Sequence, residues 1–164
     1  MIETIALTSL DGTDFDRIFD DCYDNLSVDY PWGGCETYEE RKAHLRHLME
    51  HRLTGHSPDG GTYLCLRTSQ DGYDLALAAG VVRDGHYTIW FGLLGKDPNG
   101  SRAYNHTTEY QNSSKSFYAA NGITSREYQV VTGSRAETLL LTKWGYADTG
   151  RTVGDGTVKI VNGD

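Results

Sequence analysis

Residues 27–36 hold a group of side chains that could bind a cation. Asp29 supplies a carboxylate, and Tyr30 and Trp32 supply aromatic faces, to which a protonated amine is attracted. The same aromatic side chains could instead pack this segment onto the rest of the fold, because they carry large apolar surfaces. The sequence leaves both interpretations open.

Residues 95–105 are a second candidate, because they follow an apolar segment and lead into a helical pattern. Gly100, Ser101, Arg102 and Ala103 supply small residues and one cation just before that helix. Backbone N–H groups at the start of a helix can bind phosphate without help from particular side chains. Proline, asparagine and glycine in the same segment are also typical of a plain turn. A phosphate site and a plain turn are therefore both open.

His44, His47 and His51 have spacings that align them on one face of a helix, where they could share a metal ion. No nearby carboxylate or cysteine clearly completes a ligand set, and the histidines flank the apolar stripe that contains Leu45 and Leu48. A solvated helix face is the simpler interpretation. We therefore predict no metal site.

The chain has 164 residues and a formal net charge of -8, so a polyanion would be repelled at long range. Nucleic acid is therefore not an expected partner. The acidic residues near the start either form a solvated helix face or attract a cationic substrate. They are Asp11, Asp14, Asp16, Asp20, Asp21, Asp24 and Asp29.

Composition also restricts the compartment. No apolar run approaches the ~20 residues that span a bilayer, and the first residues lack the basic and apolar parts of a secretion signal. Cys22, Cys35 and Cys65 are odd in number and lack C-x-x-C spacing, which indicates neither a disulfide framework nor a zinc site. We expect a cytoplasmic protein without a membrane partner, folded as a single domain over residues 1–164.

Hydrophobic periodicity and turn residues predict the elements that must position these groups. Thr13 with Asp16, and Thr37 with Glu40, have the spacing of capping boxes. The expected strands are residues 2–8, 62–68, 74–82, 86–94, 126–132, 147–151 and 157–161, and the expected helices are residues 13–26, 37–53, 107–121 and 134–144. The segment 86–94 is the most apolar, so we place it centrally in the sheet, with Trp90 in the core.

This order of elements resembles the GNAT superfamily of N-acyltransferases, which transfer an acyl group from acetyl-CoA or another acyl-CoA to an amine. The resemblance covers nearly the whole chain. Lys143-Trp144-Gly145-Tyr146 is similar to the Lys-x-Gly-Phe-like sequence that ends the family's fourth helix. The implied fold is α/β (α+β), with a mixed, mostly antiparallel central sheet of six to seven strands flanked by four helices.

The resemblance also implies a cofactor site. The pantetheine arm of acetyl-CoA would insert like a short extra strand between residues 86–94 and 126–132. Gly92 would mark a bulge or a close backbone approach, and it would contact the cofactor together with Leu93, Leu94 and Ser134. The pyrophosphate would lie on the loop that contains Gly100, Ser101, Arg102 and Ala103, at the positive end of the following helix.

The acceptor amine would lie beside Asp29, Tyr30 and Trp32. A small molecule or a protein could supply it, and the sequence leaves open a homodimer or a complex with another protein. Many members of the family have a tyrosine on the fourth helix, four residues before the terminal glycine, that protonates the CoA thiolate. Leu141 stands at that position, and leucine has no proton to give.

Two further departures concern the loop and the base. Residues 95–105 contain no Q/R-x-x-G-x-G/A motif, and residues 86–94 contain no carboxylate that could act as a base. His86 could accept the proton directly or through water, although a surface histidine is the simpler interpretation. The sequence therefore assigns no catalytic residue.

Three hypotheses remain at this point. The leading one is an acyl-CoA-dependent N-acyltransferase. The second is a non-catalytic GNAT-like binding or structural module, since the small, glycine-rich chain also resembles acetyltransferase-like phage proteins. The weakest is a general nucleotide binder, because neither a G-x-x-x-x-G-K-[ST] loop nor a G-x-G-x-x-G fingerprint is present.

Overall fold

The computed structural model describes residues 1–163, apart from the side chains of Asn25, Ser27, Val28, Asp29 and Tyr104. Within this described part, seven strands form one mixed sheet in the order β1-β2-β3-β4-β5-β7-β6. Only β4 and β5 pair in parallel. The strands are β1 (Ile2–Ala6), β2 (Thr62–Gln70), β3 (Tyr73–Arg83), β4 (His86–Leu94), β5 (Ser125–Val131), β6 (Ala147–Val153) and β7 (Val158–Gly163).

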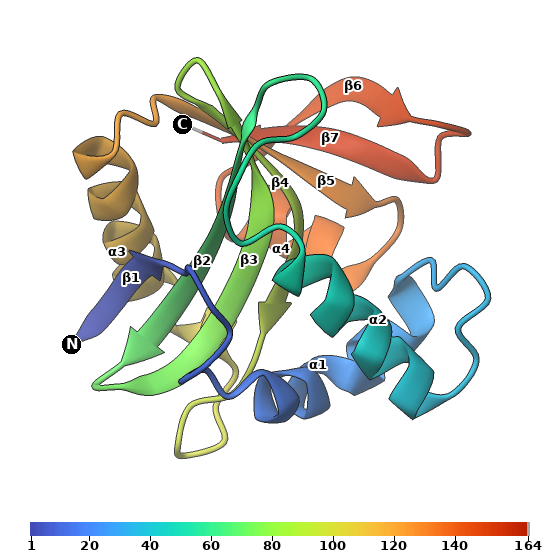
Figure 1. Cartoon of the computed structure of the whole chain (residues 1–164), viewed down its shortest axis with the longest axis vertical. Coiled ribbons are helices and arrows are strands. Elements are labelled where there is room, and N and C mark those ends of the chain that lie inside the picture. Colours follow the sequence, from blue (N-terminus) through green and yellow to red (C-terminus); the bar gives the residue numbers. More distant parts are fainter. Residues whose placement is uncertain (164) are drawn as a thin grey trace.

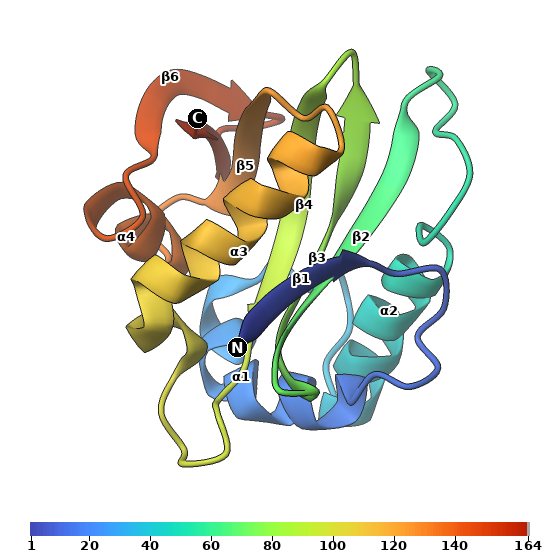
Figure 2. The same ribbon diagram turned by 90° about the vertical axis from the view of Figure 1, so that its left-hand side faces the viewer.

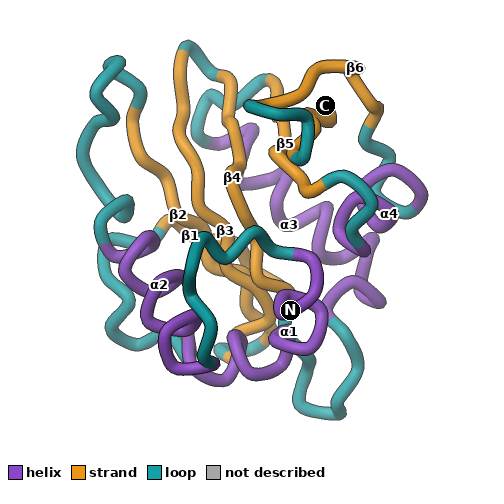
Figure 3. Tube along the Cα trace, turned by 90° about the vertical axis from the view of Figure 1, so that its right-hand side faces the viewer, coloured by secondary structure: helices purple, strands orange, loops and turns teal. Residues whose placement is uncertain are grey.

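The helices cover the two faces of the sheet unequally. Figure 1 shows α1 (Phe15–Asp29) and α2 (Tyr38–Glu50) on one side and α3 (Thr107–Ala120) on the other. A 3-10 turn, η1 (Ala103–His106), leads directly into α3, and α4 (Arg135–Thr142) connects β5 to β6. Figure 2 shows α3 lying across the strands, and Figure 3 shows α1 and α2 gathered at one end of β2, β3 and β4.

Strand alternation separates the core into layers, because successive side chains point to opposite faces. Cys65, Leu77 and Leu93 face α1 and α2, where they pack against fully buried Phe19 and Leu45. The opposite face packs against α3 through a different cluster, in which Leu66, Tyr87 and Ile89 contact Tyr118 and Ile123. The sheet is therefore the shared wall of two apolar layers.

The predicted fold class and element order are confirmed, including both hairpins. Asp71 with Gly72, and Asp84 with Gly85, all have positive φ angles, as tight two-residue hairpin turns require. The predicted start of α2 is confirmed, with the Glu40 N–H donating to Thr37 Oγ1 at 3.1 Å. The Glu40 side chain accepts in return from the Thr37 hydroxyl and the Glu36 N–H.

The predicted cap of the first helix is wrong by one residue. Asp14, not Thr13, accepts a hydrogen bond from the Arg17 N–H, and the Thr13 hydroxyl donates instead to the Leu10 carbonyl at 2.6 Å. Thr13 is held in the turn that precedes the helix. A carboxylate is also a good partner for the positive end of a helix, which favours the aspartate at this position.

Candidate functional site

The main feature of the sheet is the place where β4 and β5 part. Their parallel pairing begins at His86 with Ser125 and ends at Ile89 with Tyr128. Beyond that point β4 continues to Leu94 and β5 to Val131, and within the described residues no strand pairs with the two edges that face each other. Unpaired strand edges expose N–H and C=O groups that can bind another extended chain.

A β-bulge lies at the same place. Ala79 pairs with Phe91 and Gly80 pairs with Ile89, so Trp90 is the extra residue on β4. The sequence predicted either a bulge or a close backbone approach at Gly92, and the structure shows a close approach. A Cβ atom on Gly92 would overlap the hydroxyl oxygen of Tyr128, which reaches over from β5.

Trp90 does not lie in the core as expected. Its side chain is only partly buried, with the Arg52 guanidinium 5.5 Å from its ring and the Tyr63 ring 5.9 Å away. The bulge explains the difference, because an extra residue re-aims the side chains on the bulged strand. Trp90 lines the cleft described next.

A cleft of about 940 Å³ extends from the opening between β4 and β5 to α1, α2 and α4. Among the described residues that line it, five basic side chains accompany a single carboxylate, although the whole chain carries a charge of -8. Such a local excess of positive charge attracts an anionic ligand. The basic residues are Arg52, Arg83, Arg102, Arg135 and Lys143, and the acidic one is Asp59.

Five of the eight residues predicted to contact the cofactor line this cleft, namely Gly92, Leu93, Leu94, Arg102 and Ser134. Ser134 caps α4, where its Oγ accepts from the Glu137 N–H at 3.2 Å. Gly100, Ser101 and Ala103 are not among the lining residues. Ala103 is fully buried, and its N–H donates to the Gly95 carbonyl.

The loop of residues 95–105 already contains an anion of its own. The Asp97 carboxylate, which is 6% exposed, accepts from the N–H groups of Asn99 and Ser101, each at 2.9 Å. Its other oxygen lies 2.7 Å from His106 Nε2. The hydrogen bond from His106 and the two backbone N–H groups lower the pKa of Asp97. A phosphate at these backbone groups would have to displace Asp97.

Arg102 is also engaged, because its guanidinium donates to the backbone carbonyl of Asp21 in α1. This contact holds the loop against α1 while the side chain borders the cleft. The sequence contained a signal for the self-contained loop. Asp97 stands two residues before Asn99, and aspartate commonly accepts from the backbone two residues further on.

The three predicted acceptor-binding residues have different positions. Tyr30 lines the cleft, and burial raises the pKa of its hydroxyl, so it stays protonated near neutral pH. Trp32 is buried in the core beside Phe19, and its Nε1–H donates to the Leu26 carbonyl at 3.1 Å. These contacts agree with the alternative interpretation, in which the aromatic side chain packs the segment onto the rest of the fold. The Asp29 side chain lies outside the described residues.

A polar cluster that sequence reasoning missed lies beside the opening. His86 Nε2 lies 2.7 Å from Glu127 Oε1, and His86 Nδ1 lies 2.6 Å from Ser125 Oγ. The Thr88 hydroxyl donates to the same Glu127 oxygen at 3.2 Å. The carboxylate absent from β4 is thus supplied by β5, because parallel pairing places Glu127 directly beside Thr88.

Alternation along β5 places Glu127 on the same face as Gln129, which lines the cleft. The Glu127 side chain is only 13% exposed, and that of His86 is 35% exposed. The cluster therefore lies one strand step from the end of the parallel pairing, partly shielded from water. No local signal in the sequence gives this register, because α3 separates β4 from β5 along the chain.

The hydroxyl group absent from α4 also has a counterpart on β5. Tyr128 is the last residue paired with β4, and it borders the cleft. Burial raises its pKa well above the ordinary value for tyrosine, so its hydroxyl remains protonated at neutral pH. Tyr128 can therefore donate a hydrogen bond at the opening, which Leu141 cannot.

The remaining polar groups of α1 and α2 have structural contacts. Lys42 lies 3.2 Å from Asp20, and Arg46 lies 3.6 Å from Asp16, so part of the early acidic cluster pairs with α2. The rings of His47 and His51 are in contact, with centroids 4.1 Å apart. The described residues include no group of three or more histidine, cysteine, aspartate or glutamate side chains that could hold a metal ion.

None of the helices that the structure describes combines the length and apolar character needed to cross a membrane.

Comparisons with known proteins agree on the fold. No family model matches the sequence, and no curated protein matches it. The PaiA N-acetyltransferase from Thermoplasma acidophilum, solved with coenzyme A, has 13% identity and a TM-score of 0.61, covering 99% of this chain and 98% of that one. An N-acetyltransferase from Staphylococcus aureus Mu50 has 14% identity and a TM-score of 0.55, covering 99% and 95%.

RimL, a ribosomal L7/L12 alpha-N-protein acetyltransferase solved with coenzyme A, is similar as well. It has 11% identity and a TM-score of 0.59, covering 98% of this chain and 90% of that one. Identities this low describe the fold alone. The protein therefore has the fold of the GNAT N-acetyltransferases, as the order of its elements predicted.

Proposed function

We propose that the protein transfers an acyl group from an acyl-CoA, with acetyl-CoA as the simplest donor, to an amine. The opening between β4 and β5 carries this proposal, because it leaves strand edges unpaired at the wall of a large, positively charged cleft. Pantetheine contains amide groups that can pair with such edges, and the phosphates of CoA suit the charge. The similar PaiA and RimL enzymes were solved with coenzyme A.

The thioester is assigned to the end of β4. Gly92, Leu93 and Leu94 line the cleft on the unpaired part of the strand. Backbone N–H groups aimed at the thioester oxygen would stabilise the oxyanion, a contribution of about 3 kcal/mol per donor in other enzymes. Holding the amine beside the thioester supplies much of the remaining acceleration.

The phosphates of the cofactor are assigned to the basic side of the cleft. Arg102 and Ser134 line it, together with Arg135 and Lys143 of α4. Gly100, Ser101 and Ala103 stay in the proposal as a secondary contact. The Ser101 N–H would take part only where phosphate replaces the Asp97 carboxylate. The N–H groups of Gly100 and Ala103 donate to the carbonyls of Asp97 and Gly95, so they would take part only where those bonds open.

Glu127 and His86 are proposed as the base. An alkylamine has a pKa of about 10.4, so it must lose a proton before it can attack. Glu127 and His86 form a hydrogen-bonded pair on the strands that border the opening. A water molecule between this pair and the amine would carry the proton, a role that histidine and carboxylates commonly share.

Tyr128 is proposed to assist the leaving group. Its protonated hydroxyl lies against Gly92, where the thioester is assigned. A hydroxyl with a raised pKa is a weak acid, so it would stabilise the CoA thiolate by a hydrogen bond, and solvent would complete its protonation.

The acceptor is proposed to be an amine on a small molecule or a protein. Tyr30 would form one wall of its site, and Asp29 would add negative charge beside it. Trp32 would contribute by fixing the segment in place rather than by touching the amine, since it is buried. We expect the protein to act in the cytoplasm, and its partner could be a second copy of the chain in a homodimer or another protein in a complex.

One observation favours the second candidate, a non-catalytic binding or structural module of a cell or a virion. Two backbone N–H groups of the predicted phosphate loop, those of Asn99 and Ser101, already donate to the Asp97 carboxylate. Release of free CoA from acetyl-CoA, measured with a panel of amines, separates the two. Turnover with any amine supports the transferase. If the protein shows no turnover and also fails to bind CoA, the result favours the module.

A further inference from the structure

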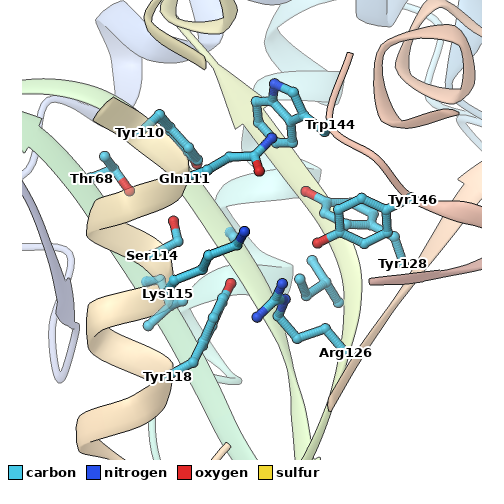
Figure 4. A pocket seen from close by; sticks show the side chains of 13 residues that line it. Thr68, Tyr110, Gln111, Ser114, Lys115, Tyr118, Arg126, Tyr128, Trp144 and Tyr146 are labelled. Atoms are coloured by element: carbon cyan, nitrogen blue, oxygen red, sulfur yellow. The ribbon is translucent and has the colours of Figure 1, made fainter. Parts of the chain in front are cut away.

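A small cavity lies under α3, on the face of the sheet opposite α1 and α2. Its volume is about 40 Å³, and Figure 4 shows polar side chains converging on it from α3, from β5 and from the segment that follows α4. We call it the α3 cavity. Those that matter here are Lys115, Tyr118, Arg126, Tyr128, Trp144 and Tyr146.

The charge of the α3 cavity is positive. Arg126 and Lys115 line it, and none of its other described lining residues carries a carboxylate. The lining tyrosines do not compensate this charge. Burial raises the pKa of Tyr110 to about 12 and raises the pKa values of Tyr118 and Tyr128 as well, so these phenols are neutral at physiological pH.

Arg126 is buried without a carboxylate partner among the residues that the structure describes. It is 7% exposed, and its guanidinium lies 4.4 Å from the centre of the Tyr118 ring and near Tyr146, whose pKa is raised by burial and lowered in smaller part by the charge of Arg126. Its Nε still has no hydrogen-bond acceptor in the described chain. A buried charge left unpaired is strongly unfavourable, so this side chain calls for an anion.

A second buried donor also lacks a hydrogen-bond acceptor. The Nε1 atom of Trp144 is buried, and the described protein atoms offer it no acceptor. Trp144 stacks on Tyr110 with ring centroids 5.1 Å apart, which fixes the indole at the cavity wall. Figure 4 shows the indole nitrogen at the end of the ring that points away from Arg126, so Trp144 lines the cavity with its ring and Arg126 supplies the unpaired donor.

The size of the cavity restricts the anion. One water molecule needs about 10–15 Å³ by the same measure, so the space holds about three atoms of that size. A carboxylate group has three heavy atoms, is planar and matches the edge of a guanidinium. Water would supply acceptors, but it would not neutralise the charge of Arg126.

We propose that the α3 cavity binds a small carboxylate, held by Arg126, with Lys115 at its mouth and the ring of Trp144 as one wall. This site is separate from the proposed acyl-CoA cleft. Tyr128 and Trp144 line both, so these two side chains form the partition between them. The proposal does not depend on the proposed function, because a protein that never binds acyl-CoA would have the same cavity.

Titration with sodium formate tests the site, with the Arg126 Nε–H signal and the three tryptophan indole N–H signals followed by NMR. Trp32 is an internal reference, because its Nε1–H is bonded to the Leu26 carbonyl in the opposite layer. Formamide is the uncharged match for formate, and sodium chloride controls for ionic strength. We expect the Arg126 Nε–H signal to shift and saturate with formate alone. An Arg126 signal unchanged at tens of millimolar formate would mean that only water fills the cavity.

Variants complete the test. Arg126→Gln removes the buried charge and should weaken formate binding about tenfold or more, the effect of one charge-assisted hydrogen bond. Since that variant could unfold, Lys115→Gln changes the exposed mouth and should weaken binding severalfold. Arg46→Gln on α2 is the matched control and should bind as the wild type does. Wild-type affinity in a folded Lys115→Gln and in Arg126→Gln would overturn the proposal.

Discussion

The hydroxyl of Tyr128 occupies the space that a side chain at Gly92 would need. The two residues lie on β5 and β4, where the parallel pairing of these strands ends. Gly92 therefore lets Tyr128 cross the opening, and Tyr128 sets how closely the strands approach. This relationship links the sheet to the proposed chemistry and gives the first prediction.

Gly92→Ala should destabilise the fold by about 1–3 kcal/mol, because the added methyl group overlaps the Tyr128 hydroxyl. Tyr128→Phe removes that oxygen, so Gly92→Ala should cost much less in the Tyr128→Phe background. Urea unfolding of the wild type, both single variants and the double variant measures the coupling. Equal costs in the two backgrounds would show that the residues do not touch.

Glu127→Gln should lower kcat roughly 100-fold, the usual effect of removing a general base. The amide keeps the shape of the side chain, so the KM for acyl-CoA should change little. Asp148→Asn is a matched control on β6, where the carboxylate pairs with Lys159. A kcat within about twofold of the wild type would remove Glu127 from the chemistry.

Arg102→Ala should weaken the binding of acetyl-CoA by about tenfold or more, if its cation faces the phosphates as proposed. Isothermal titration measures the affinity directly. Arg46→Ala serves as the control, since Arg46 pairs with Asp16 and Glu50 away from the cleft. Unchanged affinity in a folded Arg102→Ala protein would place the phosphates elsewhere.

Low pH should lower the stability of the fold through the protonation of Asp59. Hydrogen bonds from Arg83 and Ser57 lower the pKa of Asp59 from 3.8 to about 2. A carboxylate whose pKa is lower in the folded protein stabilises the fold at pH values above its pKa in the unfolded chain. This stabilisation is lost as the pH falls toward its pKa in the folded protein. The wild type should therefore lose stability between about pH 4 and about pH 2, and Asp59→Asn should lose less over that range.

Thermal unfolding measured across this pH range in both proteins checks the sign. Parallel curves for the wild type and Asp59→Asn would show that the contacts of Asp59 with Arg83 and Ser57 do not stabilise the fold.

The elements of the fold were predictable because their signals are local. Asp84-Gly85 defines a hairpin, and Thr37 with Glu40 defines a helix start, each within a few residues. The site was only partly predictable because its contacts join distant segments. Glu127 reaches His86 across a pairing of strands separated by α3, and no periodicity in either strand reports that register.

Two of the predicted binding sites make structural contacts instead. In the predicted phosphate loop, the N–H groups of Asn99 and Ser101 donate to Asp97. The indole of Trp32 is buried in the core beside Phe19 rather than turned to the cleft. In both places a residue type suited to ligand binding was equally suited to packing or turn formation. Only the three-dimensional contacts distinguish the two uses.

A thermal-shift titration with acetyl-CoA, CoA and ATP tests the central claim most directly. A ligand at 100 times its Kd stabilises a protein by about 2.7 kcal/mol, which raises the Tm of a domain of this size by several degrees. We predict a rise with acetyl-CoA and CoA and none with ATP. No rise at millimolar acetyl-CoA would contradict the transferase proposal and favour a non-catalytic module with the same fold.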